Sequence, residues 1–153
     1  MSETGRILVI DDDESIRKLL VVTLESKGYS VDTAKDGKEA IRKSASNSYN
    51  LALVDLRLPD IDGIELLTAM KETNPTMMKI IVTGYPSVQN AIEAINRGAD
   101  GYVVKPVKAE QLLSTVQEHL RKQRENKIYS EEKVKQFIDT RVRELETREQ
   151  HHS

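Results

Sequence analysis

Five polar side chains stand directly after short apolar runs, and their types suit the transfer of a phosphoryl group. Asp11 and Asp12 follow the first run, and Asp55, Thr83 and Lys105 each follow a later one. Carboxylates brought close together repel one another unless a cation joins them. Oxygen ligands without a neighbouring His or Cys suit a hard ion, and Mg²⁺ fits best because it takes few protein ligands and keeps water. A metal, an ammonium, a hydroxyl and a carboxylate nucleophile are the parts that phosphoryl transfer needs.

These residues can act together only if the apolar runs are strands of one sheet. The runs are short, rich in β-branched residues and bounded by polar or turn residues, as strands covered on both faces are. They span residues 7–10, 51–54, 80–82 and 102–104. A fifth segment, residues 29–34, alternates between apolar and polar residues, which predicts a strand at a sheet edge.

Amphipathic segments of helical length separate the predicted strands, and most of them have readable ends. Helices are predicted from Glu14 to Lys27 between the cap Asp13 and Gly28, from Gly37, from Asp62 to before Pro75, from Pro86 to Gly98, and from Lys108 through Leu120. Five strand–helix units in strict alternation predict an α/β fold, a doubly wound parallel sheet with helices on both faces. Ligands bind such sheets at the carboxyl ends of the strands, so the five polar residues should meet at one rim.

Four segments of the chain resemble the signature blocks of response-regulator receiver domains. They are Ile7–Glu14 (ILVIDDDE), Val54–Gly63 (VDLRLPDIDG), Ile81–Gly84 (IVTG) and Gly101–Pro106 (GYVVKP), in the order and at the spacing of the family. The resemblance covers about Arg6 to Leu120. It implies a five-stranded, flavodoxin-like sheet with strand order 2-1-3-4-5. It also implies a two-component signalling protein that accepts a phosphoryl group from a sensor histidine kinase, or from a phosphotransfer protein, and then changes its protein–protein contacts.

The resemblance implies a role for each residue of the predicted site. Asp55 is the phosphoacceptor, Thr83 reorients to hydrogen-bond the phosphoryl group, and Lys105 pairs with that group. Tyr102 acts with Thr83 in the switch by rotating inward behind it. The Lys105–Pro106 peptide bond is expected to be cis. The Mg²⁺ ligands are the carboxylates of Asp11, Asp12 and Asp55 and the backbone carbonyl of Arg57, with Asp11 acting largely through bound water.

Most of these residues also have a simpler structural explanation. The three consecutive acids at positions 11–13 could simply mark the start of a helix, where negative charge interacts favourably with the helix dipole. Asp13 is expected to be a cap. Tyr102 could be an ordinary half-buried aromatic of an edge strand. Asp60 and Asp62 are expected to be turn and capping residues rather than ligands. The histidines, which are interpreted as solvated surface residues, are His119, His151 and His152.

Other classes of function share some of these features. A Mg²⁺-dependent phosphatase with an aspartyl nucleophile would want a second acid two residues after Asp55, where Arg57 stands. A nucleotide-binding module would want a G-x-G-x-x-G or P-loop motif after a strand, and the sequence has neither. A degenerate receiver that binds partners without phosphorylation is a third alternative, against which the complete set of acids argues. A receiver assists its own phosphorylation and dephosphorylation, so no enzyme acting on an outside substrate is expected.

The composition predicts a cytoplasmic protein. The 153 residues carry a formal net charge of −2, which is too balanced to indicate a nucleic-acid or membrane surface, so neither direct nucleic-acid binding nor membrane contact is expected. The chain has no cysteine, which excludes disulfides and thiolate metal sites. The first residues lack the apolar core of a signal peptide, and no apolar run reaches the roughly 20 residues that a membrane span needs.

The end of the chain is rich in charges of both signs. We predict a receiver domain at residues 1–123 and an amphipathic helical extension at residues 124–153, with the preceding helix ending near Asn126 and a new one capped by Ser130. Apolar residues then recur at three- and four-residue spacing, namely at Val134, Phe137, Ile138, Val142 and Leu145. This stripe, with Phe137 as its anchor, could dock on the receiver, pair with a second copy or contact another partner. A homodimer could also form through the face of the fourth helix, fifth strand and fifth helix.

Overall fold

Strands and helices alternate along the chain, as the sequence predicts. The computed structural model describes residues 4–152 and, for side chains, residues 4–148. In chain order the elements are β1 (Arg6–Ile10), α1 (Glu14–Glu25), β2 (Ser30–Ala34), α2 (Gly37–Ser46), β3 (Leu51–Val54), α3 (Gly63–Thr73), β4 (Met78–Thr83), α4 (Val88–Asn96), β5 (Gly101–Val104) and α5 (Ala109–His152).

The strands form one parallel sheet in the order β2-β1-β3-β4-β5, which is the order that the resemblance implies. β2 lies at one edge of the sheet, as its alternating pattern predicts. The chain starts in the interior at β1, moves outward to β2, and then crosses to β3 on the other side of β1. The strand order therefore reverses between β1 and β3, and the carboxyl ends of these two strands are where such folds bind ligands.

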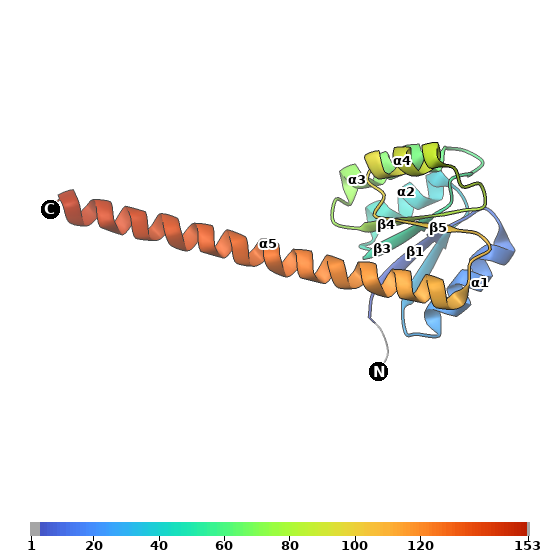
Figure 1. The fold of residues 1–153 in the computed structure, drawn as a ribbon, viewed down its shortest axis with the longest axis horizontal. Helices are drawn as coiled ribbons and strands as arrows, with labels where there is room; N and C mark the ends of the chain where they lie inside the picture. The colour runs from blue at the N-terminus through green and yellow to red at the C-terminus, as the bar shows by residue number, and fades with distance from the viewer. Residues whose placement is uncertain (1–3, 153) are drawn as a thin grey trace. The chain divides into compact units, whose positions relative to one another are not determined.

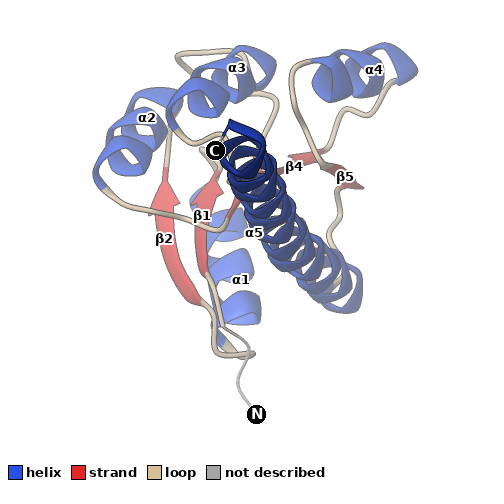
Figure 2. Ribbon diagram, turned by 90° about the vertical axis from the view of Figure 1, so that its left-hand side faces the viewer, coloured by secondary structure: helices blue, strands red, loops and turns tan. Residues whose placement is uncertain are grey.

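Helices cover both faces of the sheet, as Figures 1 and 2 show. α2, α3 and α4 pack on one face, and α1 and the first turns of α5 pack on the other. Because side chains alternate along a strand, the neighbours Ile7 and Leu8 of β1 belong to opposite cores. The buried apolar residues of α5 in this domain, Leu112, Val116 and Leu120, recur every four residues and lie against the sheet.

Side-chain caps fix where four of the helices begin. The side chains of Asp13, Asp36, Asp62 and Ser87 each accept a hydrogen bond from a backbone N–H in the first turn of the following helix. The predicted caps at Asp13 and Asp62 are thus confirmed. The prediction that α4 begins at Pro86 is wrong by two residues, because Ser87 provides a capping hydroxyl and α4 starts after it.

The described chain divides into two compact units, one ending at Leu120 and the other starting at Arg121. The second unit is helical through Ser130, so the predicted interruption near Asn126 and the new cap at Ser130 are wrong. Residues 121–148 contain neither Gly nor Pro, and an ion pair between Arg121 and Glu125 (2.8 Å) spans one helical turn. The domain boundary at residues 123 and 124 stays a prediction. Within residues 4–152, no helix combines the length and the apolar character that crossing a membrane requires.

Candidate metal and phosphoacceptor site

Backbone hydrogen bonds bring the predicted site residues to one rim of the sheet. The N–H of Asp11 donates to the carbonyl of Ala34 at the end of β2 (3.1 Å), and the N–H of Asp55 donates to the carbonyl of Ile10 at the end of β1 (3.0 Å). The N–H of Lys105 donates in the same way to the last carbonyl of β4 (2.8 Å). Strand pairing therefore continues one residue beyond the strands, which holds these three residues in register.

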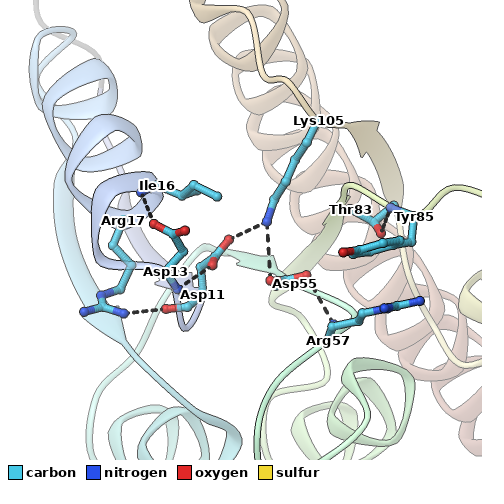
Figure 3. Close-up of polar contacts among 9 residues, drawn as sticks. All are labelled: Asp11, Asp13, Ile16, Arg17, Asp55, Arg57, Thr83, Tyr85 and Lys105. Atoms are coloured by element: carbon cyan, nitrogen blue, oxygen red, sulfur yellow. Dashed lines mark hydrogen bonds and ion pairs between the residues drawn. The ribbon is translucent and has the colours of Figure 1, made fainter.

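Lys105 lies between two buried carboxylates, as Figure 3 shows. Its Nζ is 2.8 Å from Oδ2 of Asp11 and 3.3 Å from Oδ2 of Asp55. The residues Asp11 and Asp55 are only 2% and 7% exposed, so both acids are largely shielded from water. One ammonium therefore forms ion pairs with two carboxylates whose charge little solvent stabilises.

Asp12 completes a group of three acids that could hold a metal ion. Asp11, Asp12 and Asp55 each offer a carboxylate oxygen, and these oxygens all lie within 4.8 Å of one another. An ion bonded to oxygen at about 2.0–2.6 Å can bridge atoms that far apart. Asp12 is exposed, so the group opens to solvent on its side. The geometry and the donor set both fit a hard divalent cation.

Burial and charge oppose each other at Asp55 and Lys105. The pKa of the Asp55 carboxyl lies above its usual value, mainly because burial raises it. The hydrogen bond from the N–H of Arg57 lowers this pKa, and the negative charge of Asp11 raises it further. Burial lowers the pKa of the Lys105 ammonium, but the hydrogen bonds and charges of Asp11 and Asp55 outweigh it, and the net pKa is raised. Additional positive charge at the site would therefore stabilise the ionised form of Asp55.

The loop that follows Asp55 folds back tightly against it. A Cβ built on Gly63 would lie 2.4 Å from the backbone oxygen of Asp55 and 2.7 Å from the Cα of Leu56, so only glycine fits there. The N–H of Gly63 donates to the carbonyl of Leu56 (2.9 Å), and the N–H of Arg57 donates to Oδ1 of Asp55 (3.2 Å). The acceptor side chain is thus held in place by its own loop.

Thr83 lies fully buried at the end of β4, next to a pair of stacked side chains. Its Oγ1 accepts a hydrogen bond from the N–H of Tyr85 (3.0 Å), which leaves its own O–H free to donate elsewhere. The ring of Tyr85 stacks against the guanidinium of Arg57, with the Arg57 Cζ 3.5 Å from the ring centroid (Figure 3). Nδ2 of Asn90 in α4 donates to the carbonyl of Tyr85 (3.3 Å). These contacts connect the loops after β3 and β4 with the first turn of α4.

Tyr102 is half-buried in β5, and its ring packs against the core beneath α3 and α4. Its hydroxyl is buried and has no hydrogen-bond partner within the described residues. A buried hydroxyl without a partner costs about 1–3 kcal/mol of stability. Packing therefore stabilises the ring of Tyr102 in this position, and the unpaired hydroxyl destabilises it. The predicted rotation of Tyr102 on phosphorylation stays a prediction.

Replacing Tyr102 with Phe should stabilise the protein by about 1 kcal/mol, because the change removes the unpaired hydroxyl and keeps the ring. Thermal and urea unfolding of the full chain measure the difference. The matched control is Tyr49→Phe, which removes a hydroxyl that donates to Oδ2 of Asp32 (2.6 Å) and should destabilise. Equal destabilisation by both changes would mean that the Tyr102 hydroxyl has a hydrogen-bond partner in solution.

Two acids of the acceptor loop have structural roles, as the sequence predicts. Oδ1 and Oδ2 of Asp60 accept hydrogen bonds from the N–H groups of Gly37 and Lys38 (both 2.9 Å), so Asp60 reaches across to the start of α2. Asp62 caps α3 by accepting from the N–H of Ile64 (2.9 Å). The Lys105–Pro106 peptide bond is cis, also as expected.

The interpretation of His119 as a solvated residue is wrong. The side chain is buried (8% exposed) between α5 and the loop before β5, with Nδ1 2.7 Å from the carbonyl oxygen of Thr115 and Nε2 2.9 Å from that of Asp100. His119 lies three residues after the buried Val116, on the side of the helix that meets the sheet. Its burial follows from this position, which the polar character of histidine does not indicate. The side chains of His151 and His152 lie outside the described residues.

Two residues beside the site are not anticipated by the sequence. Tyr85 stacks on Arg57, and Nη1 of Arg17 in α1 donates to the carbonyl of Asp11 (2.8 Å). For Tyr85 the sequence does contain a usable signal. Tyr85 stands two residues after Thr83 and must therefore lie near the same strand end. The contact of Arg17 depends on where α1 packs and has no local signal.

The fold and the acidic site together define a receiver domain, and comparisons with known proteins agree. Residues 7–117 match the family model for the response regulator receiver domain. The chain belongs to this family and is the receiver domain of a two-component response regulator. The predicted family and fold class are thus confirmed.

Similar proteins include both longer regulators and single receivers. The chain is 36% identical to the response regulator ArlR of Staphylococcus saprophyticus over 118 residues, which are 77% of this chain and 53% of that protein. It is 40% identical to the transcriptional regulatory protein ZraR of Klebsiella oxytoca over 114 residues, 74% of this chain and 26% of that protein. The crystal structure of a CheY-like receiver domain protein from Methanospirillum hungatei superposes with a TM-score of 0.79 at 40% identity and covers 81% of this chain and 99% of that one. The match thus spans about half or less of these curated relatives.

The similar proteins do not support the expectation that the protein makes no direct contact with nucleic acid. It rests on the charge balance of this chain alone. Two of the similar proteins, ZraR and YkoG of Bacillus subtilis, are named transcriptional regulatory proteins, and the match covers only 26% and 52% of them. The net charge of a receiver segment says nothing about what such longer proteins bind.

Proposed function

We propose that this receiver accepts a phosphoryl group on Asp55 from the phosphohistidine of a sensor kinase or phosphotransfer protein. In this proposal Mg²⁺ is held by the carboxylates of Asp11, Asp12 and Asp55 and by the backbone carbonyl of Arg57, with Asp11 acting largely through water. The observation that carries the proposal is the cluster of three carboxylate oxygens within 4.8 Å, bridged on one side by the ammonium of Lys105. A cation, three acids and a hydroxyl at one sheet rim are the parts of a phosphoacceptor site.

In the transfer itself, a carboxylate oxygen of Asp55 attacks phosphorus. The bond from phosphorus to the imidazole nitrogen of the donor breaks, and its electron pair stays on that nitrogen, which then binds a proton. Lys105 is already within 3.3 Å of the acceptor and neutralises the negative charge of the incoming phosphoryl oxygens. Thr83 has a free O–H that can donate to one of these oxygens. The bound metal supplies charge neutralisation and alignment of the phosphoryl oxygens.

The output of the switch is a change in protein–protein contacts. Phosphorylation adds about −1.5 to −2 charges beside Asp55. When Thr83 turns toward the phosphoryl group, its hydrogen bond from the N–H of Tyr85 is released, and Asn90 connects that same residue to α4. Tyr102 behind Thr83 completes the switch. The surface of α4, β5 and α5 is where a partner or a second copy would detect the change, since α4 exposes apolar side chains there (Val88, Ile92 and Ile95).

A phosphatase with an aspartyl nucleophile is the weaker candidate. Such an enzyme needs an acid two residues after Asp55 to transfer a proton, and Arg57 at that place is engaged in stacking on Tyr85. In the favoured function the chain assists its own phosphorylation and dephosphorylation and turns over no outside substrate. A location in the cytoplasm fits a receiver that must meet the kinase domain of its sensor.

The test of this function is phosphorylation of the full chain by a small phosphodonor. Incubation with acetyl phosphate and Mg²⁺ should add the mass of one phosphoryl group, which intact mass spectrometry detects and tandem spectra of borohydride-trapped peptides assign to Asp55. Removal of the divalent ion with a chelator should suppress the adduct. Absence of any adduct with Mg²⁺ would reject the function, and an adduct that forms equally well under chelation would reject its metal dependence.

A further inference from the structure

The helix from Arg121 onward carries an apolar stripe that its own unit leaves uncovered. Within residues 121–148, Ile128, Ile138, Val142 and Leu145 are 55%, 53%, 47% and 50% exposed. A helix in which half of each large apolar side chain meets water is marginal by itself, because helical stability comes mainly from packing of the apolar face. A second surface should therefore cover this stripe.

Four of these residues fit one heptad register. Ile128 and Val142 occupy a positions, and Ile138 and Leu145 occupy d positions of the same register. Val142 at a and Leu145 at d form a combination that favours two parallel strands, whereas isoleucine at d, as at Ile138, favours larger assemblies. From Ile128 onward, the remaining core positions hold Glu131 and Lys135, and polar residues at such places fix the register at a cost in stability.

The charges beside this seam are sorted by heptad position. The e positions are all acidic, namely Glu125, Glu132, Asp139 and Glu146. The g positions are Lys127, Val134, Arg141 and Arg148, so every charged residue at g is basic. Glu125 and Arg141 also form ion pairs within their own helix, with Arg121 and Glu144, whereas Lys127 and Glu132 form no ion pair within the described residues.

The sorting discriminates between the two ways of pairing identical helices. In a parallel pair in register, each g residue faces the e residue five positions later on the other helix, so Arg141 faces Glu146 and Lys127 faces Glu132 of the second copy. In an antiparallel pair, g faces g and e faces e, which would place acids against acids and bases against bases. Charge complementarity at the e and g positions thus favours the parallel arrangement, although Glu131 and Lys135 at core positions then face the same residues of the second copy at a cost in stability.

We infer that residues 127–148 pair with the same residues of a second copy of this chain as a parallel, in-register, two-stranded coiled coil. This pairing needs no phosphoryl group and is separate from the proposed transfer to Asp55. Phe137 falls at a c position and Tyr129 at a b position, outside the seam. In this pairing the seam is formed by Ile138, Val142 and Leu145 rather than by Phe137.

The first test measures the mass of the full chain in solution by sedimentation and light scattering over a range of concentrations. The wild type should approach twice the chain mass of 17.3 kDa. Arg141→Glu and Glu146→Arg should each weaken pairing by about tenfold, because each replaces two attractive contacts per dimer by two repulsive ones. The double swap should restore most of the wild-type pairing, the remainder being lost with the ion pair between Arg141 and Glu144 of the same helix (3.0 Å). Residues five apart on one helix do not face each other, so only a contact between copies explains such a rescue.

The second test determines the relative orientation of the two helices by disulfide formation. The chain has no cysteine of its own, so only the introduced thiols can react. Leu145→Cys places a thiol at a d position, where two parallel copies bring their Cα atoms within disulfide range. Air oxidation of this variant should give a covalent dimer at low protein concentration. Thr147→Cys places the thiol at the outward f position and serves as the matched control, which should stay largely uncrosslinked.

Three results would overturn the inference. They are a monomeric wild type at every concentration, failure of the double charge swap to restore pairing while circular dichroism shows intact helix, and equal crosslinking at positions 145 and 147. A monomer would leave docking on the receiver or binding of another partner as the role of the stripe. Phosphorylation of Asp55 can succeed or fail independently of all three results.

Discussion

An Asp55→Asn chain incubated with acetyl phosphate and Mg²⁺ will keep the mass of the unmodified protein. The amide has no anionic oxygen with which to attack phosphorus, and it is also a poorer ligand for a cation. The fold should tolerate the change. The amide oxygen of the variant can still accept from the N–H of Arg57, and Lys105 keeps its shorter contact with Asp11 (2.8 Å). Because burial makes ionised Asp55 unfavourable, stability should be unchanged or slightly higher.

The control for this variant is Asp62→Asn in the same loop. Asp62 caps α3 through the N–H of Ile64, and asparagine is an equally good cap, so fold and stability should both be preserved. This variant should gain the phosphoryl group as the wild type does. An adduct of equal abundance in Asp55→Asn would move the acceptor to another residue and remove the basis of the proposed function.

Lys105→Met should lower the free energy of unfolding by about 3 kcal/mol, near the lower end of the range for breaking a buried ion pair. The change removes the cation from between Asp11 and Asp55, whose side chains are only 2% and 9% exposed, and leaves two shielded carboxylates facing each other. For a domain of this size the melting temperature should fall by roughly 10 °C. Thermal unfolding with a chelator present measures the effect without interference from divalent ions.

Mg²⁺ should reverse part of this loss, because a cation among the same oxygens replaces the missing ammonium. The melting temperature of Lys105→Met should therefore rise more on addition of Mg²⁺ than that of the wild type. The matched control is Lys79→Met in β4. Burial lowers the pKa of Lys79, and its Nζ donates to the carbonyl of Met77 rather than to a carboxylate, so its loss should be neutral or stabilising. A similar loss of stability in both variants would mean that the Lys105 effect reflects packing rather than charge.

The parts of the fold that follow from local patterns are those that the sequence predicts well. The alternating pattern of β2 places it at the sheet edge, and the apolar runs of β1, β3 and β4 are buried in the interior. The caps Asp13 and Asp62 mark the helix starts because their chemistry acts within one turn. The site is also foreseeable, since each polar residue stands at the end of a strand or within two residues after it, and parallel strands end on the same rim.

The errors come from features that tertiary packing decides. His119 is buried because α5 turns that face toward the carbonyl of Asp100, a residue 19 positions away. Ser130 can cap a helix, but the helix formers around it make continuation more favourable. The stacking of Tyr85 on Arg57 joins two loops that are distant in sequence and leaves no periodic signal.

The hydrogen bonds that extend strand pairing to Asp11 and Asp55 also set the width of the acidic site. These two residues continue adjacent strands, β1 and β3, and neighbouring strands are spaced at about 4.8 Å by the geometry of the peptide group. The separation between the backbones of Asp11 and Asp55 is thus fixed by the pairing of two strands and not by the conformation of a loop. Substitutions in the surrounding loops should therefore act on the other proposed ligands, Asp12 and the carbonyl of Arg57, and leave the spacing of these two acids unchanged.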